Sequence, residues 1–503
     1  MKLYMIGIDA VPLWLLEELK GKKGMSGFRK LLAKGCITNM NSTLPPLTGP
    51  AWPTIYTGLS PAEHGVPDFF EMKSNYTPDI AYYDSHLFPP FWEKLAEKGL
   101  RCLVVTPATC IKLTDSKNVD LITGFPLSAR TNSPMLEKLM KEHKFTGEPD
   151  IEKDIKAGKM PLKEALPIFV RSIRKRIAIT KEAMANKEYD FAYVCFTETD
   201  RLQHFVLNRK DWQDYLHPIY SEMSGFIEEI MEKCDEEKAS LIIVSDHGSQ
   251  PIHEKFLINT WLVNNGYASL NENIMQKGSE EKSEKSSVKY MIRENLIRNA
   301  KFRRIYDRMP HAIKSKAHSA LGKVFSGAST GDYTRVHLFD FDMEKTVAFA
   351  AISNDPVSTI WINDGRFEKG IVKEKDKAKL KEELMDKLRK IKGRKGEKLI
   401  INVFDGRDYY KKTTRFIAPD IMVQAEEGYT IDIFYYSMKS MFMEPETPKS
   451  GDHIRNGIFG FYSKTSKPIG INADVLNVAP TILEYFGINR GNKHNSILKK
   501  IRH

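Results

Sequence analysis

Short apolar runs alternate with longer amphipathic stretches along the first half of the chain. The apolar runs are Leu3–Ile8, Arg101–Thr106, Phe191–Phe196 and Leu241–Val244. Their length and composition predict buried strands. Residues 13–35 (with a break near Gly24), 91–99 and 162–186 carry apolar residues at three- and four-residue spacing, which predicts helices. Buried strands separated by helices are typical of an α/β fold with a mostly parallel central sheet and helices on both faces.

The pattern changes after the middle of the chain. Strand-like runs at 346–352, 358–364 and 399–404 surround a charged helical stretch at 373–392. They predict a smaller α+β cap subdomain that is inserted before the main fold resumes and ends with a helix at 475–486. The predicted organisation is a core of residues 1–270 and 441–503, a charged linker with a basic segment at 271–330, and the inserted subdomain at 331–440.

Charge is unevenly distributed. The 503-residue chain has a net charge of +11, and much of the surplus falls within residues 286–323, where only Glu294 and Asp307 oppose the Lys and Arg residues. Two interpretations of this partly amphipathic segment stay open: a solvated helix, or a contact with an anionic membrane surface or an acidic substrate. We expect no specific nucleic-acid binding, and the sequence does not predict the oligomeric state.

The cysteines and the N-terminal sequence indicate where in the cell the protein is expected. The 5 cysteines are scattered without a CxxC spacing, which favours buried thiols in a reducing compartment. The N-terminus, MKLYMIGIDA, lacks the long apolar stretch and cleavage site of a signal peptide, and no apolar run reaches the roughly 18 residues of a membrane-spanning helix. We therefore expect a cytoplasmic protein.

Three predicted strands end in an aspartate. Asp9 follows the first strand, Asp200 comes shortly after the strand at 191–196, and Asp246 follows the strand at 241–244. The carboxyl ends of parallel strands meet at one edge of a sheet, where ligands bind. A turn or helix-cap role is the alternative for each aspartate taken alone.

Histidines accompany two of these aspartates. His247 directly follows Asp246, and His204 lies four residues after Asp200, on the same face if a helix begins there. A later His453 follows a Gly-Asp pair, and its alternative is a surface position. Three aspartates and three histidines give three ligands to each of two metal ions, and three protein ligands with an open position are typical of catalytic zinc. Two such ions about 4 Å apart form the clamp used in phosphoryl transfer.

A candidate nucleophile lies in the stretch 44–65, LPPLTGPAWPTIYTGLSPAEHG. Prolines near its start and Gly58 after its last apolar turn predict a short helix at about 50–57. Thr48 lies at the N-terminal mouth of this helix, where free backbone N–H groups favour an anion. A simple N-cap is the alternative role for Thr48.

Together these motifs resemble the alkaline phosphatase superfamily, and most closely its type I phosphodiesterase/nucleotide pyrophosphatase branch. The resembling pieces, in the family's order, are IGIDA at 6–10, PLTGPAWPTIYTGLSPAEHG at 46–65, TETDRLQH at 197–204, SDHG at 245–248, GDH…GIF at 451–459 and NVAPTILEYFG at 477–487. The TDRLQH form and the inserted subdomain are similar to those of prokaryotic phosphodiesterase-like members.

The resemblance implies a role for each residue. Asp9, Asp246 and His247 would hold one divalent metal together with the Thr48 oxygen, and Asp200, His204 and His453 would hold the other. Zinc is expected first, with manganese or iron as alternatives. Thr48 would attack phosphorus, form a phospho-threonine intermediate and be released by water. Backbone N–H groups of Gly49 and Ala51 would hold phosphate oxygens.

One position departs from the family pattern. Nucleotide pyrophosphatases typically carry an Asn-His pair a few residues after the nucleophile, and here Ala51 and Trp52 occupy those places. Since the amide donor is missing, nucleotide substrates are in doubt. Lys345, Arg366 and Arg407 of the inserted subdomain are candidates for contacting a substrate anion, with ordinary surface roles as the alternative.

The sequence thus predicts a metal-dependent phosphoesterase acting on a small-molecule phosphate ester. Two alternatives stay open. One is a phosphomonoesterase or a phosphotransferase/mutase of the same superfamily, which would pass the phosphoryl group to an alcohol. The other is a non-enzymatic protein that binds anionic surfaces through 286–323.

Overall fold

The computed structural model describes residues 1–271, 335–336, 341–352, 355–411, 413–436, 440–445, 449–466, 470–488 and 496–501. The basic segment predicted at 286–323 lies outside these residues.

The main sheet is mixed and mostly parallel, as predicted. Its eight strands are, in spatial order, β21 (Ala473–Asp474), β2 (Ile37–Asn41), β20 (Asn456–Ser463), β8 (Ser240–Val244), β1 (Leu3–Ile8), β7 (Phe191–Phe196), β5 (Cys102–Val105) and β6 (Val119–Ile122). Strands β8, β1, β7, β5 and β6 run parallel, and β20 is antiparallel to both of its neighbours. The apolar runs recognised in the sequence therefore form the centre of the sheet.

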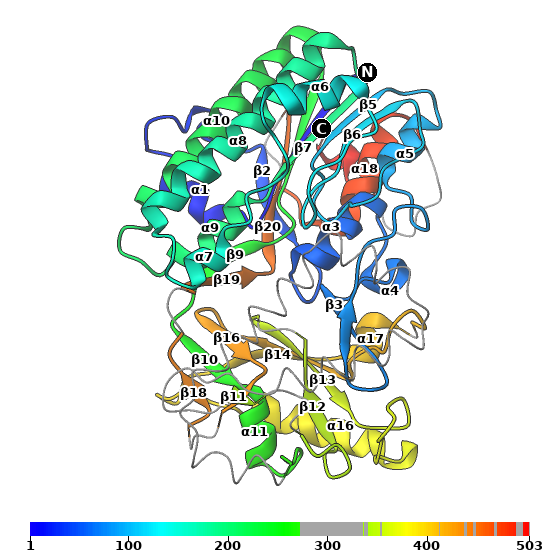
Figure 1. The fold of residues 1–503 in the computed structure, drawn as a ribbon, viewed down its shortest axis with the longest axis vertical. Coiled ribbons are helices and arrows are strands. Elements are labelled where there is room, and N and C mark those ends of the chain that lie inside the picture. Colours follow the sequence, from blue (N-terminus) through cyan, green and yellow to red (C-terminus); the bar gives the residue numbers. More distant parts are fainter. Residues whose placement is uncertain are drawn as a thin grey trace.

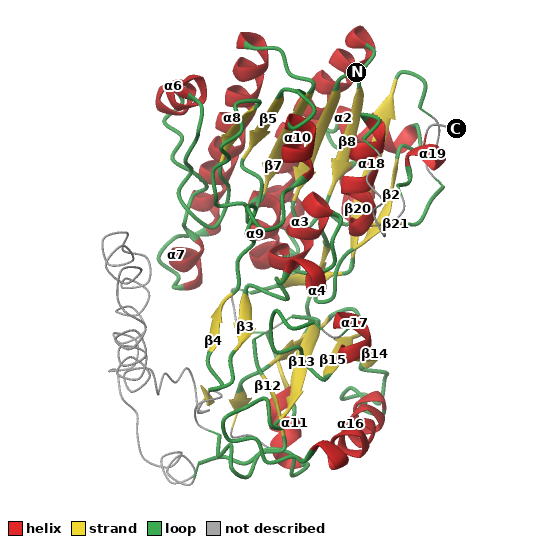
Figure 2. Ribbon diagram, turned by 90° about the vertical axis from the view of Figure 1, so that its right-hand side faces the viewer, coloured by secondary structure: helices red, strands yellow, loops and turns green. Residues whose placement is uncertain are grey.

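Each face of this sheet is covered by helices (Figures 1 and 2). Tyr4, Ile6 and Ile8 of β1 point into a core shared with α2 (Ser26–Ala33), α8 (Leu162–Asn186) and α10 (Trp212–Glu237). Leu3 and Met5, which alternate with them, point into a second core shared with α3 (Thr48–Thr57), α5 (Phe91–Ala96) and α18 (Val478–Tyr485). A strand covered on both faces must be apolar throughout, which explains the continuous run.

The helices predicted in the first half of the chain are present. The helix α8 has the predicted bounds, and residues 13–35 divide into α1 (Leu13–Leu19) and α2. Gly24, at the break between them, has a φ of 82°, a conformation that glycine adopts at little cost. The predicted helix at 475–486 begins as a 3₁₀ turn, Val475–Asn477, before α18.

A second lobe lies beyond the carboxyl ends of the parallel strands (Figure 1). Its four-stranded sheet has the order β12 (Ala348–Ala350), β13 (Val357–Ile362), β15 (Ile421–Ala425) and β14 (Ile400–Asp405). The helix α16 (Glu374–Arg389) covers it, and α17 (Gly406–Tyr410) follows β14. Trp361, Phe349 and Leu384 belong to a separate hydrophobic core. This is the α+β subdomain that the sequence predicted.

The lobe begins earlier than the predicted boundary at residue 270. Strand β10 (Glu254–Leu257) pairs with β16 (Tyr429–Asp432) and β18 (Phe442–Met443), and α11 (Ile258–Asn264) packs in the same core. The main core was predicted to extend to residue 270, but β10 and α11 belong to the second lobe instead. The four residues of β10 are too few to show a clear alternation of apolar and polar positions, and the strands that pair with β10 lie far along the chain. The chain returns to the main lobe at β19 (Gly451–Ile454), which pairs with β9 (Gly248–Pro251).

A hairpin from the main lobe reaches into the second one. It consists of β3 (Phe70–Met72) and β4 (Pro78–Ile80). The Tyr76 hydroxyl at its turn donates to Asn363 Oδ1 at 2.8 Å, and the Tyr76 ring stacks on Phe367 with 5.2 Å between centroids. Side-chain packing and hydrogen bonds thus join the two lobes.

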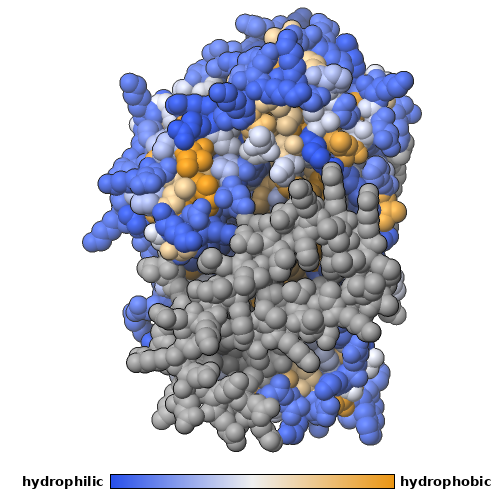
Figure 3. Space-filling model, viewed as in Figure 1, coloured by the Kyte–Doolittle hydropathy of each residue, from blue (hydrophilic) through white to orange (hydrophobic). Residues whose placement is uncertain are grey.

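The described surface is mainly hydrophilic on the face seen in Figure 3, with scattered hydrophobic patches. Among the helices that the structure describes, none combines the length and the apolar character needed to cross a bilayer. All five cysteines are buried and free.

Candidate metal centre

Adjacent parallel strands bring the three predicted aspartates to one place. Strand β1 lies between β7 and β8, with Ile8 opposite Phe196 and Gly7 opposite Val244. The three strands therefore end side by side. Asp9 directly follows β1, Asp246 comes two residues after the end of β8, and Asp200 lies in the first turn of α9 (Glu198–Val206). This edge of the sheet faces the second lobe (Figure 1).

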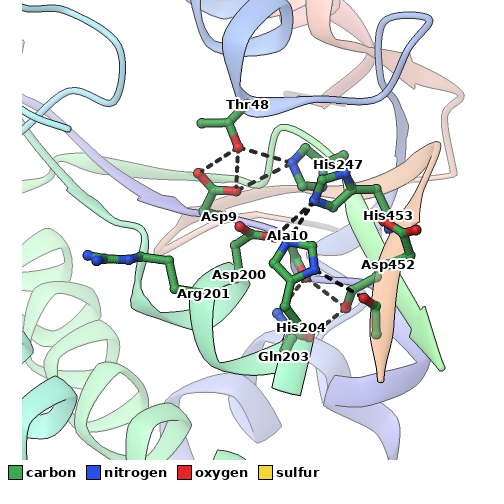
Figure 4. A network of polar contacts seen from close by, with 12 residues as sticks. Asp9, Ala10, Thr48, Asp200, Arg201, Gln203, His204, His247, Asp452 and His453 are labelled. Carbon is green, nitrogen blue, oxygen red and sulfur yellow. Dashed lines mark hydrogen bonds and ion pairs between the residues drawn. The ribbon is translucent and has the colours of Figure 1, made fainter. Parts of the chain in front are cut away.

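The first cluster surrounds the Thr48 hydroxyl (Figure 4). Thr48 Oγ1 lies 3.3 Å from Asp9 Oδ1 and 3.3 Å from His247 Nε2. His247 Nε2 lies 3.4 Å from Asp9 Oδ1 and 3.3 Å from Asp246 Oδ2. Asp246 Oδ2 is buried and lacks a hydrogen-bond partner among the described residues. Four potential ligand atoms thus converge, one of them otherwise unsatisfied.

The second cluster lies next to the first. His204 Nε2, from α9, is 3.4 Å from Asp200 Oδ1 and 3.1 Å from His453 Nε2. His453 Nε2 is itself 3.3 Å from Asp200 Oδ1. The rings of His247 and His453 have centroids 4.3 Å apart, so the two clusters are neighbours. Figure 4 shows His204 and His453 pointing toward each other from α9 and β19.

These separations fit metal coordination. Ligand atoms about 2.0–2.1 Å from a tetrahedral zinc lie about 3.3 Å from one another. The contacts within both clusters lie between 3.1 and 3.4 Å. The donor set of carboxylate oxygens and imidazole nitrogens suits zinc and its first-row neighbours. The six residues, with Thr48, can therefore hold two divalent ions.

A group that the sequence did not single out also approaches the second cluster. Asp452, His204 and His453 offer ligand atoms within 4.8 Å of one another. The Asp452 carboxylate is already used, because Oδ2 accepts from Thr430 Oγ1 and from Lys449 Nζ at 3.0 Å, and Oδ1 accepts from the His453 N–H at 3.1 Å. Asp200 is the better third ligand, since its carboxylate faces both imidazoles.

Crowded carboxylates make this edge a poor place for negative charge without a cation. Burial, followed by the charges of Asp246 and Asp200, raises the pKa of Asp9 well above its usual range. Burial and the charge of Asp200 raise the pKa of Asp246 to about 8. Protons occupy these carboxyls where positive charge is lacking, and a divalent ion can replace them.

The histidines differ in charge state. Burial, with the nearby charge of His453, lowers the pKa of His247 to about 3, so its imidazole is neutral and available as a ligand. Burial also lowers the pKa of His453, but the carboxylates of Asp355 and Asp200 outweigh it and raise the pKa well above the usual value. Asp200 is held ionised: burial opposes its charge, but His204 and His453 lower its pKa overall.

The start of helix α3 lies over the first cluster. Its first residue is Thr48 and its N-cap is Leu47, so Thr48 is not the cap. The Ala51 N–H donates to the Leu47 carbonyl at 3.0 Å, which corrects the expectation that it binds phosphate. Gly49 N–H lies in the first turn, where helical carbonyls are not available to accept it. A Cβ at Gly49 would meet the Asp68–Phe69 backbone at 3.2 Å, so this turn fits closely.

Trp52 supports the cluster in a way that the sequence did not reveal. Its indole Nε1 donates to Asp9 Oδ2 at 3.0 Å, which leaves Oδ1 facing Thr48 and His247. The ring is completely buried and packs over Gly7 of β1, where a Cβ would meet it at 2.7 Å. The Trp52 side chain thus fixes a candidate ligand.

The three basic candidates of the second lobe are paired elsewhere. Arg366 contacts Asp364 and Asp420, Lys345 lies 3.2 Å from Asp342, and Arg407 lies 3.7 Å from Glu374. These contacts favour the structural roles over substrate binding.

A buried ion network holds the start of α9. Arg176 of α8 is fully buried, pairs with Glu198, lies 3.3 Å from Glu148 Oε1 and donates to the Cys195 carbonyl at 2.7 Å. Arg201, the residue after Asp200, binds Glu152 and lies 3.4 Å from Glu148 Oε2. The network fixes α9 on both sides of Asp200.

Comparison with known proteins identifies the family of this chain. The profile of the type I phosphodiesterase / nucleotide pyrophosphatase family matches residues 3–449. The chain belongs to this family. It is accordingly a hydrolase of phosphate esters, and the family's members are metal-dependent. A search of curated proteins found no match.

Two solved structures share the fold of this phosphodiesterase-family chain. Phosphonoacetate hydrolase from Sinorhizobium meliloti 1021, in complex with phosphonoacetate, has 13% identity and a TM-score of 0.54, with 95% of this chain and 94% of that chain covered. Human ectonucleotide pyrophosphatase / phosphodiesterase 5 has 12% identity and a TM-score of 0.50, with 100% of both chains covered. At such identities the likeness concerns the fold.

Arg176→Ala should reduce the free energy of unfolding by about 3–5 kcal/mol, because Glu198 and Glu148 would remain buried without their partner. Arg174→Ala is the matched control on the same helix. Arg174 is 63% exposed in its pair with Glu222, so its loss should cost at most about 1 kcal/mol. Urea unfolding followed by circular dichroism measures both. Equal losses would contradict a special role for the buried network.

Metal binding should strengthen with pH. The raised pKa of Asp9 and Asp246 means that the folded metal-free protein retains protons that the unfolded chain releases near pH 4. The metal-free fold therefore loses stability as pH rises toward 8, and an ion that displaces one proton should bind about tenfold tighter per pH unit. Thermal melts with and without zinc should show a larger stabilisation at pH 8 than at pH 6. Asp246→Asn should reduce the difference, and a larger effect at pH 6 would contradict this account.

Proposed function

We propose that the chain is a two-metal phosphodiesterase, similar to nucleotide pyrophosphatases, that uses Thr48 as its nucleophile. The observation that supports this proposal most directly is the convergence of Thr48 Oγ1, Asp9 Oδ1 and His247 Nε2 at mutual distances of 3.3–3.4 Å. A hydroxyl among ligands at this spacing can become the oxygen that attacks phosphorus. Asp9, Asp246 and His247 would hold one ion with Thr48, and Asp200, His204 and His453 the other.

The proposed reaction has two displacements. Thr48 Oγ1 releases its proton to solvent and attacks the phosphorus, the bond to the leaving oxygen breaks, and a phospho-threonine forms. Water then attacks the same phosphorus, the bond between phosphorus and Oγ1 breaks, and Thr48 regains a proton as the phosphate leaves. The two divalent ions, when bound, would supply the positive charge that lowers the pKa of the attacking hydroxyl and neutralises the leaving oxygen.

The chain's own residues position these steps. Asp9 Oδ1 lies 3.3 Å from Thr48 Oγ1 and orients this hydroxyl. The hydrogen bond from Trp52 Nε1 to Asp9 Oδ2 prevents the Asp9 carboxylate from rotating away. The first turn of α3 adds the Gly49 N–H, a donor for a phosphate oxygen. Burial of Thr48, Asp9 and His247 limits access of water and strengthens the electrostatic interactions of the site.

Two finer points belong to the proposal. Zinc suits the mixed carboxylate and imidazole set, and manganese or iron remain alternatives. The cytoplasm is the proposed location, because the five buried cysteines are free thiols. A phosphomonoesterase or a phosphotransferase/mutase of the superfamily would use the same nucleophile, and the choice of substrate distinguishes them.

Thr48→Ala should lower turnover by on the order of 10⁴-fold or more while metal content stays close to that of the wild type, because the carboxylate and imidazole ligands remain. Thr57→Ala, in the last turn of the same helix, is the control, since its hydroxyl binds the Pro53 carbonyl away from the cluster. Steady-state hydrolysis and elemental analysis measure the two effects. Unchanged turnover in Thr48→Ala would remove Thr48 from the mechanism.

The substrate class can be tested on metal-stripped protein reloaded with zinc or manganese. We expect a chromogenic phosphodiester to be hydrolysed faster than the matching monoester. A preference for the monoester would contradict the phosphodiesterase assignment and favour phosphatase or mutase chemistry. Transfer of phosphate to an added alcohol would then identify a phosphotransferase.

A further inference from the structure

The two ring nitrogens of His453 face different lobes. Nε2 points into the second cluster, 3.3 Å from Asp200 Oδ1 and 3.1 Å from His204 Nε2. Nδ1 points the other way and lies 2.9 Å from Asp355 Oδ1. This contact has the distance of an ion pair but not the alignment of a hydrogen bond. A carboxylate thus faces the outer nitrogen of a candidate metal ligand.

Asp355 belongs to the second lobe. It lies two residues before strand β13, and its carbonyl accepts from the Ile431 N–H at 3.1 Å on β16. The adjacent Pro356 carbonyl accepts from the Ala425 N–H at 2.7 Å on β15. The side chain of Asp355 is only 14% exposed. The backbone around Asp355 is therefore tied to two strands of its own lobe, while its carboxylate contacts a residue of the other lobe.

A second contact between the lobes occurs beside this one. The Thr430 hydroxyl of β16 donates to Asp452 Oδ2, and Lys449 Nζ lies 3.0 Å from the same oxygen. Asp452 cannot take the place of Asp355, because its carboxylate is occupied by these donors and by the His453 N–H. Among the described residues, Asp355 is the carboxylate in contact with His453 Nδ1.

Histidines that bind metals usually donate their other ring N–H to a carboxylate, a carbonyl or water. This contact selects the tautomer, orients the ring and makes the coordinating nitrogen a stronger ligand. The other two histidines meet carbonyls in this way: His204 Nδ1 lies 3.0 Å from the Gly451 carbonyl and His247 Nδ1 lies 3.1 Å from the Gly248 carbonyl. Only for His453 does the partner come from the inserted lobe.

We propose that Asp355 is a positioning residue, which holds His453 Nδ1 so that Nε2 binds the second metal, and that the inserted lobe thereby completes the metal centre. This inference rests on the two-metal function proposed above. It assigns the lobe a role at the metal itself in addition to any contact with substrate.

The test measures metal binding rather than turnover. Zinc affinity and stoichiometry would be determined by competition with a chromogenic chelator for the full-length wild type, Asp355→Ala and Asp355→Asn. Asp386→Asn is the matched control, because Asp386 is an exposed aspartate of the same lobe that pairs with Arg389 on α16. In Asp355→Ala we expect one of two sites to weaken about 10- to 100-fold and the other to remain unchanged. Asp355→Asn, which keeps an acceptor oxygen, should weaken less.

Substitution with cobalt(II) reports the coordination geometry of each ion. A general loss of stability would not change that geometry at one ion alone. The visible absorption of cobalt(II) depends on the coordination of each ion, so the Asp355→Ala spectrum should change for one ion only. The Asp386→Asn spectrum should match the wild type. The isosteric Asp355→Asn serves for both measurements if Asp355→Ala does not fold.

The outcomes separate the inference from the proposed function. If the wild type binds two ions and both Asp355 variants bind them with unchanged affinity and spectra, the positioning role is overturned while the two-metal function stands. If the wild type does not bind two ions, the proposed function is overturned and this inference with it. Equal weakening of both ions would also contradict a role specific to His453.

Discussion

The mutual repulsion of three neighbouring carboxylates, two of them buried, is the constraint around which this molecule is organised. Asp9, Asp200 and Asp246 meet because β1 lies between β7 and β8, all parallel. The fold cannot separate them without changing the strand order. Their charges must therefore be balanced by protons, by histidines or by bound cations, and the raised pKa of Asp9 and Asp246 reflects that need. The proposed metal centre would balance these charges and supply the chemistry of the family at the same place.

Rigid support around the cluster determines which oxygen faces which partner. Trp52 donates to one oxygen of Asp9, so the other is left for Thr48 and His247. On the opposite side, Arg176 and Arg201 fix the turn of α9 that carries Asp200. Buried ion pairs of this kind add little net stability over an apolar core, but breaking one is costly. The ion pairs of Arg176 and Arg201 are therefore better explained by the precise placement of Asp200 than by the stability of the fold.

Much of this could be predicted from the sequence, for a physical reason. Continuous apolar strands separated by helices imply a parallel sheet, and its carboxyl edge gathers the residues after each strand, so Asp9, Asp246 and His247 stood out. Trp52 and Asp355 did not, because their partners are brought near only by the tertiary fold. The strand β10 was missed for the same reason: its four residues pair with β16 and β18, which come much later in the chain. Ala51 was misjudged because its N–H is taken by a helix that begins earlier than expected.

The contacts of His453 connect the two lobes chemically. The hairpin residue Tyr76 reaches from the main lobe into the second, while Asp355 and Thr430 reach from the second lobe to β19. A shift of the second lobe would therefore move the carboxylate at His453 Nδ1 as well as any substrate contacts. Since a ligand's strength depends on the partner of its outer nitrogen, lobe position and affinity at the second cluster should be coupled. Such coupling is reciprocal, so an ion bound at His453 would in turn favour the arrangement of lobes in which Asp355 faces it.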